Sequence, residues 1–161
     1  MNVKKICLTF MVAAAYMALG FIFQSIAFGA IQIRIADALY PLISLGSSFL
    51  LGTFLGHLIF NTYGFTTGIA LGIGDLASPF IFLIPKLLIW KFGKFKKGLI
   101  ATTLLHTITV TLWVSYLLQS MFGVPQIITA PTIFAGEAIA EAVVGIPLTV
   151  AIKNRIGKWF K

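Results

Sequence analysis

The stretch GAIQIRIADALYP, residues 29–41, places Gln32, Arg34 and Asp37 between two long apolar runs. Charged side chains are costly at membrane depth, so they usually face a cavity, a partner or a ligand there. Arg34 and Asp37 lie three residues apart, so within a helix they would share a face and pair. The alternative is that both residues only hold an external loop at the headgroup layer.

The composition of the whole chain is that of an integral membrane protein. Of its 161 residues, 59% are hydrophobic and 10% are charged, and the mean hydropathy is +1.02. Soluble domains average about 25% charged residues. At about 20 residues per crossing, the chain is long enough for five or six helices. We therefore expect one transmembrane domain over residues 1–161, an all-α bundle without a separate soluble part.

The net charge of +8 comes from clustered basic residues. Ten of the twelve fall in three clusters, namely Lys4 and Lys5, then Lys91, Lys94, Lys96 and Lys97, then Lys153, Arg155, Lys158 and Lys161. Each cluster adjoins an apolar segment, as the positive-inside rule requires of cytoplasmic loops. This distribution argues against nucleic acid as the partner and predicts that the N- and C-termini both lie in the cytoplasm.

With both ends of the chain inside, the number of crossings must be even, and six helices fit best. We expect them at about residues 5–28, 34–45, 49–63, 67–90, 98–122 and 132–152. The second is short, the fourth is broken around residues 72–75, and residues 123–131 form an outer loop. Irregular backbone at membrane depth is tolerated only inside protein or beside a water-filled cavity. A binding cavity is therefore expected beside the short and broken helices.

The first apolar segment, residues 6–28, is longer than the 7–15 residues of a signal-peptide core, so we interpret it as a transmembrane helix rather than a cleaved signal. Ala14 and Ala18 lie four residues apart on it, and such a small-residue pair allows close helix packing. Their partner is either another helix of the bundle or a second protein.

Only four acidic residues occur, Asp37, Asp75, Glu137 and Glu141. Glu137 and Glu141 share one helix face. Two carboxylates away from bulk water repel each other unless one is protonated or a donor-rich group lies between them. The structural alternative is that they pair with Arg34 or Lys86. Asp75 could instead serve as a helix N-cap.

Other side chains could complete a site. Asn61 and His106 are expected at a similar depth to the carboxylates, and Trp113 with Tyr116 could stack on a planar ligand. Each aromatic could equally serve in packing or at the membrane interface. His57 and His106 lie far apart in sequence, and together with a lone cysteine they make a metal site improbable.

No pattern in the chain favours catalysis. A serine–histidine–acid set, a nucleotide-binding glycine loop and a metal-ligand cluster are all missing from the sequence. Without a P-loop, the protein cannot drive transport by its own ATP hydrolysis. The residues alone thus predict a small membrane protein that is not an enzyme. Its acid-lined pocket, open to the outside, would suit a ligand that is cationic or rich in N–H donors.

Residues 28–39, FGAIQIRIADAL, resemble the G-x-x-Q-x-R-x-x-E-A-L signature of the QueT-type queuosine-precursor transporters, substrate-binding S components of energy-coupling factor (ECF) transporters. Asp37 stands where the family usually has glutamate. Three further matches follow in the family's order, namely Phe54-Leu55-Gly56 with Asn61, Asp75 at the opening of the fourth helix, and Gly136-Glu137 with Gly145-Ile146-Pro147-Leu148 in the last. Ala14 and Ala18 also resemble the alanine motif by which S components dock on their transmembrane partner.

The resemblance implies a multi-pass protein of the bacterial cell membrane that captures a 7-deazaguanine from outside, such as preQ0, preQ1 or queuine. Its partners would be an ECF transmembrane scaffold subunit, which Ala14 and Ala18 would face, and two cytoplasmic ATPases. No cofactor is implied.

The resemblance also suggests roles for individual residues. The guanine edge offers an N1–H and an exocyclic amine, a donor pair that one carboxylate can accept. We expect Glu137 to accept it, with Asn61 or Gln32 at the carbonyl or pyrrole edge.

A cationic aminomethyl substituent could be met by Asp75 or Glu141. Arg34 would then organise the loop by pairing with Asp37 or Glu141.

Three alternatives remain at this point. The chain could be an S component for another vitamin-like molecule. It could be an ion- or proton-coupled secondary carrier in which Glu137 and Glu141 relay protons. It could also be an accessory membrane subunit that binds no ligand.

Overall fold

Long apolar segments become helices in lipid because a helix satisfies its own backbone hydrogen bonds. The computed structural model describes residues 2–27 and 33–156, and over these residues the protein is all-helical, with no strand. Its elements are α1 (Val3–Ile22), α2 (Gln24–Ala27), η1 (Ile35–Leu45), α3 (Ser47–Thr66), α4 (Gly72–Ile81), α5 (Leu83–Phe92), α6 (Lys96–Phe122), α7 (Gln126–Ala138), η2 (Ile139–Gly145) and α8 (Ile146–Ile156). The element η1 is a 3₁₀ helix and η2 is a π-helical turn.

Four helical stretches of the described residues are long and apolar enough to cross a membrane. The first is α1, the second consists of α4 and α5, the third is α6, and the fourth is the continuous helix that runs from α7 through η2 into α8. The other two expected crossings correspond to α3, which has 20 residues, and to η1, which has 11. The prediction of an all-α protein with membrane-spanning, short and broken helices is therefore confirmed, with four candidate spans, while the count of six crossings stays a prediction.

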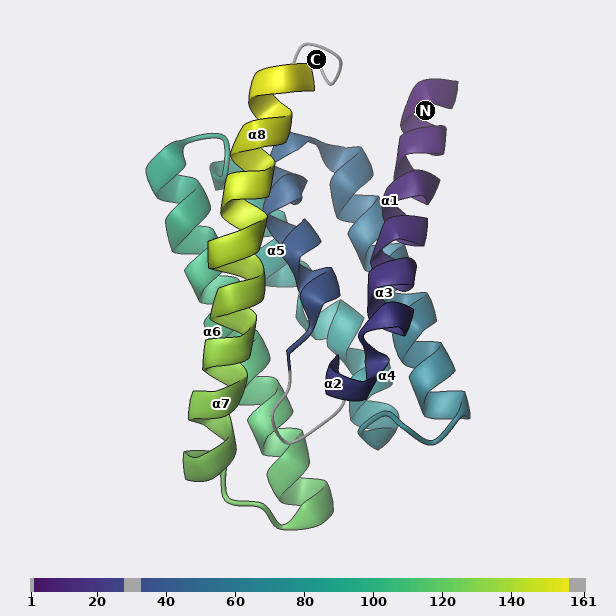
Figure 1. The fold of residues 1–161 in the computed structure, drawn as a ribbon, viewed down its shortest axis with the longest axis vertical. Helices are drawn as coiled ribbons and strands as arrows, with labels where there is room; N and C mark the ends of the chain where they lie inside the picture. The colour runs from purple at the N-terminus through teal and green to yellow at the C-terminus, as the bar shows by residue number, and fades with distance from the viewer. Residues whose placement is uncertain (1, 28–32, 157–161) are drawn as a thin grey trace.

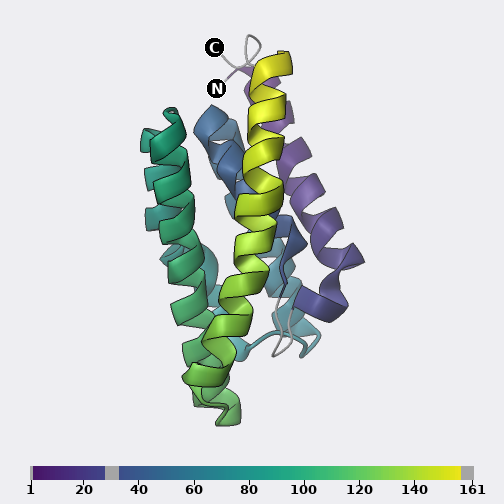
Figure 2. The same ribbon diagram turned by 60° about the vertical axis from the view of Figure 1, so that its left-hand side comes forward.

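One end of the bundle collects the basic residues. Figures 1 and 2 show that α1 begins and α8 ends at the same end of the molecule. At that end Ser48 donates a hydrogen bond to the Lys5 carbonyl, 3.2 Å away, and Lys153 donates one to the Lys94 carbonyl, also at 3.2 Å. Lys94 lies in the turn between α5 and α6, so the three basic clusters meet here as far as they are described.

Two predicted boundaries are wrong. The break in the fourth helix falls at Phe82, between α4 and α5, and α4 begins at Gly72. Pro85 explains the position, because it has no N–H to donate to the carbonyl of Ile81. The outer loop at residues 123–131 is also shorter than expected, since α7 begins at Gln126 and continues through Pro131.

Close approach of α1 and α3 closes one side of the bundle. A Cβ at Gly52 would lie 2.6 Å from Val12 Cβ, and one at Gly56 would lie 2.7 Å from Tyr16 Cβ. These two glycines form a G-x-x-x-G face, which lets helix backbones approach in lipid. The glycines of α3 therefore allow packing and do not interrupt the helix.

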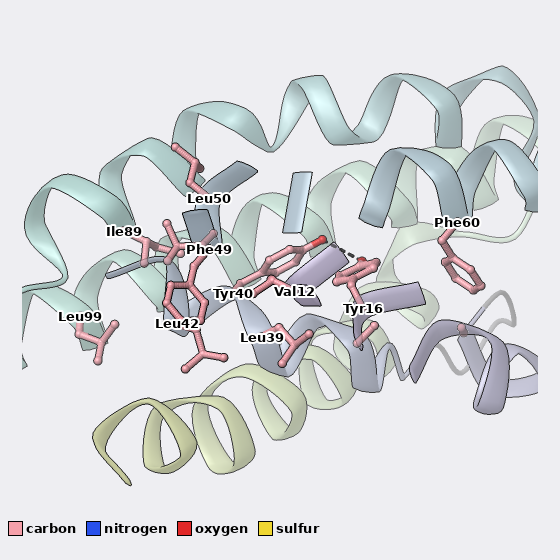
Figure 3. Close-up of a cluster of buried hydrophobic side chains, with 13 residues drawn as sticks. Val12, Tyr16, Leu39, Tyr40, Leu42, Phe49, Leu50, Phe60, Ile89 and Leu99 are labelled. Atoms are coloured by element: carbon pink, nitrogen blue, oxygen red, sulfur yellow. Dashed lines mark hydrogen bonds between the residues drawn. The ribbon is translucent and has the colours of Figure 1, made fainter. Parts of the chain in front are cut away.

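The element η1 lies inside this bundle, and its residues 36–44 are buried. It packs against α1, α3, α5, η2 and α8. Figure 3 shows the apolar cluster around it, in which Tyr16 from α1 and Tyr40 from η1 point toward each other with their hydroxyl groups hydrogen-bonded at 2.9 Å. This cluster holds η1, and with it Asp37, at the centre of the molecule.

Candidate functional site

Arg34 joins three elements at the start of η1. Its Nη2 donates to Asp75 Oδ1 at 3.2 Å, its Nη1 lies 3.2 Å from His57 Nε2, and its Nε donates to the Ala27 carbonyl at 3.3 Å. The expected pairing of Arg34 with Asp37 or Glu141 is therefore wrong. Arg34 is the residue before the helix, with φ −91° and ψ 87°, so the i,i+3 rule for helical neighbours does not apply to it.

Asp75 is buried in the first turn of α4. Its Oδ2 accepts the backbone N–H of Leu71 at 2.6 Å, while Oδ1 accepts from Arg34. Leu71 is the N-cap residue, so the prediction of Asp75 as the cap is wrong. The carboxylate nevertheless bonds a backbone donor that helix starts leave unsatisfied. Asp75 thus has partners for both of its oxygens.

His57 of α3 is the centre of this polar network. Tyr40 OH lies 2.8 Å from its Nδ1, and the amide nitrogen of Asn61 lies 3.0 Å from its Nε2. Because Arg34 also presents a donor to Nε2, we assign Nε2 as the acceptor and Nδ1 as the protonated nitrogen. Lys86 of α5 lies beside the group, with its Nζ 4.2 Å from the centre of the Tyr40 ring and 3.2 Å from Nδ1, which carries a proton in this assignment and so does not accept from it.

The second part of the site is a group of three carboxylates, which we call the acid cluster: Asp37, Glu137 and Glu141. All three are fully buried, and an oxygen from each lies within 4.8 Å of the others. Carboxylates this close repel unless they share protons or a cation or N–H donors lie between them. The acid cluster can therefore hold a cation or a donor-rich group.

The three carboxylates differ in how many partners they have. Asp37 Oδ1 accepts from the Tyr16 hydroxyl at 2.6 Å. Glu141 accepts from His106 Nδ1 at 2.7 Å and from the Thr107 hydroxyl at 3.1 Å. No hydrogen-bond donor of the described residues reaches Asp37 Oδ2 or either oxygen of Glu137. When the acids are ionised, the cluster thus presents three acceptor atoms without a donor from the described residues, while a protonated Glu137 would hydrogen-bond to Asp37.

Backbone geometry brings the acid cluster together. Glu141 lies in the π-helical turn η2, and such turns are frequent at functional sites. Gly145 ends η2, and a Cβ there would lie 2.5 Å from the carbonyl oxygen of Ala38. This close approach sets η2 against η1, so Asp37 meets the two glutamates across the contact.

The remaining predicted residues divide between this site and other places. Asn61 belongs to the network, and its amide nitrogen donates to the Asp75 carbonyl at 2.8 Å while its Oδ1 has no partner in the described part of the chain. Gln32 lies outside the described residues. Trp113 donates to the Gly74 carbonyl at 3.3 Å and stands beside Tyr116. Stacking of Trp113 on a ligand stays a prediction.

Trp113 and Tyr116 line a shallow groove of about 360 Å³ with Ile81, Thr109 and Leu112. The groove is apolar and contains no carboxylate. The acids themselves are fully buried, so the expected acid-lined pocket open to the outside is closed in this structure.

Ala14 and Ala18 lie on the exposed side of α1. The opposite side of α1, which includes Ala13 and Tyr16, packs against α3. The two alanines are therefore free to contact another protein.

Sequence reasoning missed several members of the site, namely Tyr16, Tyr40, His57, Ser78 and Lys86, all of them buried. Two of them carried a usable signal. His57 and Lys86 are ionisable residues inside apolar segments, and such residues face the protein interior or a water-filled cavity. The tyrosines carried no signal of this kind, because tyrosine is equally common in packing and at membrane interfaces.

Comparison with known proteins gives one assignment. The QueT transporter family matches the chain over residues 6–154. The chain belongs to the QueT transporter family. Searches of curated proteins and of solved structures gave no significant match.

Membership of the QueT family makes the protein a transporter and not an enzyme. It also implies a small-molecule substrate and a location in a membrane, in agreement with the apolar helices. The family match runs from the first turn of α1 to the last turn of α8, and it includes the whole of the polar network and the acid cluster.

Proposed function

We propose that this QueT-family protein is the substrate-capture (S) component of an ECF-type importer, and that it binds a queuosine precursor, a 7-deazaguanine, from outside the cell. Partner ATPases would power the uptake. The observation that carries the proposal is the state of Glu137, a carboxylate buried completely within the bundle that receives no hydrogen bond from a donor of the described residues.

An unsatisfied buried carboxylate is expensive, so its retention calls for a partner that is present only part of the time. The guanine edge provides one, since its N1–H and exocyclic amine point the same way and match the two oxygens of a carboxylate. Glu137 is therefore our candidate for the group that accepts hydrogen bonds from the guanine edge.

Asn61 supports this site from the side of α3. Its amide nitrogen donates to the Asp75 carbonyl and to the Ser78 hydroxyl, the latter at 2.9 Å. Its Oδ1 has no donor among the described residues and remains available as an acceptor. An acceptor suits the pyrrole N–H of a deazaguanine better than its carbonyl. Gln32 remains our second candidate for these ring edges.

The arrangement of the basic clusters supports a six-crossing topology with both termini in the cytoplasm. The described basic residues of the three clusters gather at one end of the bundle, and positive charge marks the cytoplasmic side. The turn at residues 123–125 and the start of α4 would then face outward. The membrane would be the cytoplasmic membrane of a bacterium.

The test of the proposal is ligand binding by purified protein with Glu137 replaced. Glu137→Gln keeps the size of the side chain but turns one acceptor into a donor that would face the donors of guanine. We expect 7-deazaguanine affinity to fall by at least about tenfold, since hydrogen bonds to charged groups are worth about 1.5–3 kcal/mol. Glu137→Asp, which keeps the charge, should lose less.

Thr62→Val is a matched control for this test, because Thr62 is exposed on α3 and its hydroxyl donates to the Leu58 carbonyl of its own helix. Undiminished deazaguanine binding by Glu137→Gln would contradict the role assigned to Glu137.

One observation favours a second candidate function. The buried contact between His106 and Glu141, 2.7 Å long, could pass a proton in a proton-coupled secondary carrier. Such a carrier would transport without ATPase partners and would respond to a proton gradient. Uptake by vesicles that contain only this chain distinguishes the two functions.

A further inference from the structure

We propose that Asp37 makes this transporter selective for substrates that carry a protonated amine over neutral substrates with the same ring. The inference rests on the proposed function. It names the charge of the preferred substrate and the residue that recognises it.

The hydrogen-bond partners of the other carboxylates lead to Asp37. Both oxygens of Asp75 accept hydrogen bonds, one from Arg34 and the other from the Leu71 N–H. Both oxygens of Glu141 likewise accept hydrogen bonds, one from His106 and the other from Thr107. Neither acid therefore offers an oxygen without a donor, although the sequence favoured these two for the contact with a substrate cation.

Asp37 is different, because only one of its oxygens has a partner. The Tyr16 hydroxyl, 2.6 Å from Oδ1, fixes the orientation of the carboxylate. Oδ2 is buried and, while the neighbouring Glu137 is ionised, receives no donor from the described residues. Since the side chain is already positioned by Tyr16, an incoming ammonium group needs to order little else to bond to Oδ2.

The charge around Asp37 supports the same conclusion. Among residues 2–27 and 33–156, the buried cationic side chains other than histidine are Arg34 and Lys86. Arg34 forms an ion pair with Asp75, and Lys86 Nζ lies over the Tyr40 ring, from where it interacts electrostatically with Asp37 and Glu141 without contacting either. Within this part of the chain, no lysine or arginine nitrogen lies within 4.0 Å of a carboxylate oxygen of the acid cluster.

Three buried carboxylates without such a partner must be neutralised by protons or by a cation. Glu137, when it accepts the guanine edge, gains hydrogen bonds but no positive charge, because that edge is neutral. An ammonium group on the same substrate would supply the missing charge next to Asp37 and Glu141. Its three N–H donors could contact more than one of these oxygens, which lie within 4.8 Å of one another.

The test compares two ligands that share a ring but differ in charge. Binding of 7-aminomethyl-7-deazaguanine, which is cationic at neutral pH, and of neutral 7-cyano-7-deazaguanine is measured on the purified full-length protein in lipid nanodiscs. We expect the cationic ligand to bind at least about tenfold more tightly, the effect of one charge-assisted hydrogen bond.

Two variants assign the preference to the acid cluster. In Asp37→Asn the affinity ratio of the cationic to the neutral ligand should fall toward one. Glu141→Gln, which also removes a charge from the cluster, serves as the second variant if Asp37→Asn does not fold. Thr62→Val, at an exposed position of α3, should keep the wild-type ratio.

Each outcome decides a different point. Equal binding of both ligands, or a preference for the nitrile, overturns the inference and leaves the proposed function standing. An unchanged ratio in folded Asp37→Asn also overturns it. Binding of neither ligand overturns the proposed function itself. Tight binding of Ca²⁺ or Mg²⁺ alone, lost in Asp37→Asn, would show that the cluster holds a metal ion instead of a substrate amine.

Discussion

Buried polar residues of this protein are arranged in two groups, and the difference between the groups indicates their roles. The side chains around His57 are largely satisfied by one another, as expected of a network that fixes structure. In the acid cluster, Glu137 and one oxygen of Asp37 have no donor within the described residues. Unsatisfied buried groups in a native protein call for an explanation, and a ligand provides it.

Arg34 should be essential for stability because it joins η1, α3 and α4. Arg34→Met leaves Asp75 buried without its ion partner, and breaking a buried pair typically costs about 3–5 kcal/mol. We expect a clearly lower unfolding temperature in detergent. Restoration of part of that loss in Arg34→Met/Asp75→Leu would confirm the cause, and a wild-type melting curve for Arg34→Met would refute it.

The sequence identified the polar residues of this region better than it identified their partners. Arg34, Asp75 and Asn61 were recognised as site residues, and all three meet in the structure. Their pairing could not be predicted, because Asp75 is 41 residues from Arg34 in the chain. Local spacing rules describe neighbours within one helix and not contacts between helices.

At the scale of the elements, the contact between η1 and η2 creates the acid cluster. The short η1 was predicted, as a helix over residues 34–45. The π-helical turn at η2 was not predicted, because its sequence is apolar and similar to that of a regular helix. Its consequence is the position of Glu141, which depends on the wider turn and on Gly145.

Gly145→Ala should therefore disturb the site without touching a site residue. The added methyl group would meet the Ala38 carbonyl at 2.5 Å and Pro41 at 2.9 Å, and overpacking of this kind costs about 1–3 kcal/mol. We expect both a lower melting temperature and weaker deazaguanine binding. Val143→Ala is the control, since Val143 is 66% exposed on the same turn. Equal behaviour of the two variants would argue against the close contact.

On the scale of the whole molecule, one side of α1 packs in the bundle and the other is left exposed. Hydropathy and charge predicted the bundle class and the grouping of basic residues at one end, because both depend only on composition along the chain. Helix breaks were harder to locate, since proline in a membrane helix either ends it or is accommodated by its neighbours. Pro131 is accommodated within α7, whereas Phe82, three residues before Pro85, marks a break.

The exposed alanines of α1 give a prediction about assembly. Ala14→Trp places a bulky group on the surface that we assign to the scaffold subunit, so it should abolish co-purification with the ECF module while ligand binding persists. Val143→Trp puts the same side chain on another exposed surface and should leave the complex intact. If Ala14→Trp loses ligand binding as well, the variant is misfolded. Retention of the complex would place the partner elsewhere.

The central claim is that this protein captures a 7-deazaguanine, and equilibrium binding to the purified wild-type protein tests it most directly. The panel should contain 7-deazaguanines, guanine and a set of vitamins. We predict tight binding of at least one deazaguanine and much weaker binding of the vitamins. Binding of a vitamin in preference to every deazaguanine would contradict the account and would make the protein a capture component for another small molecule.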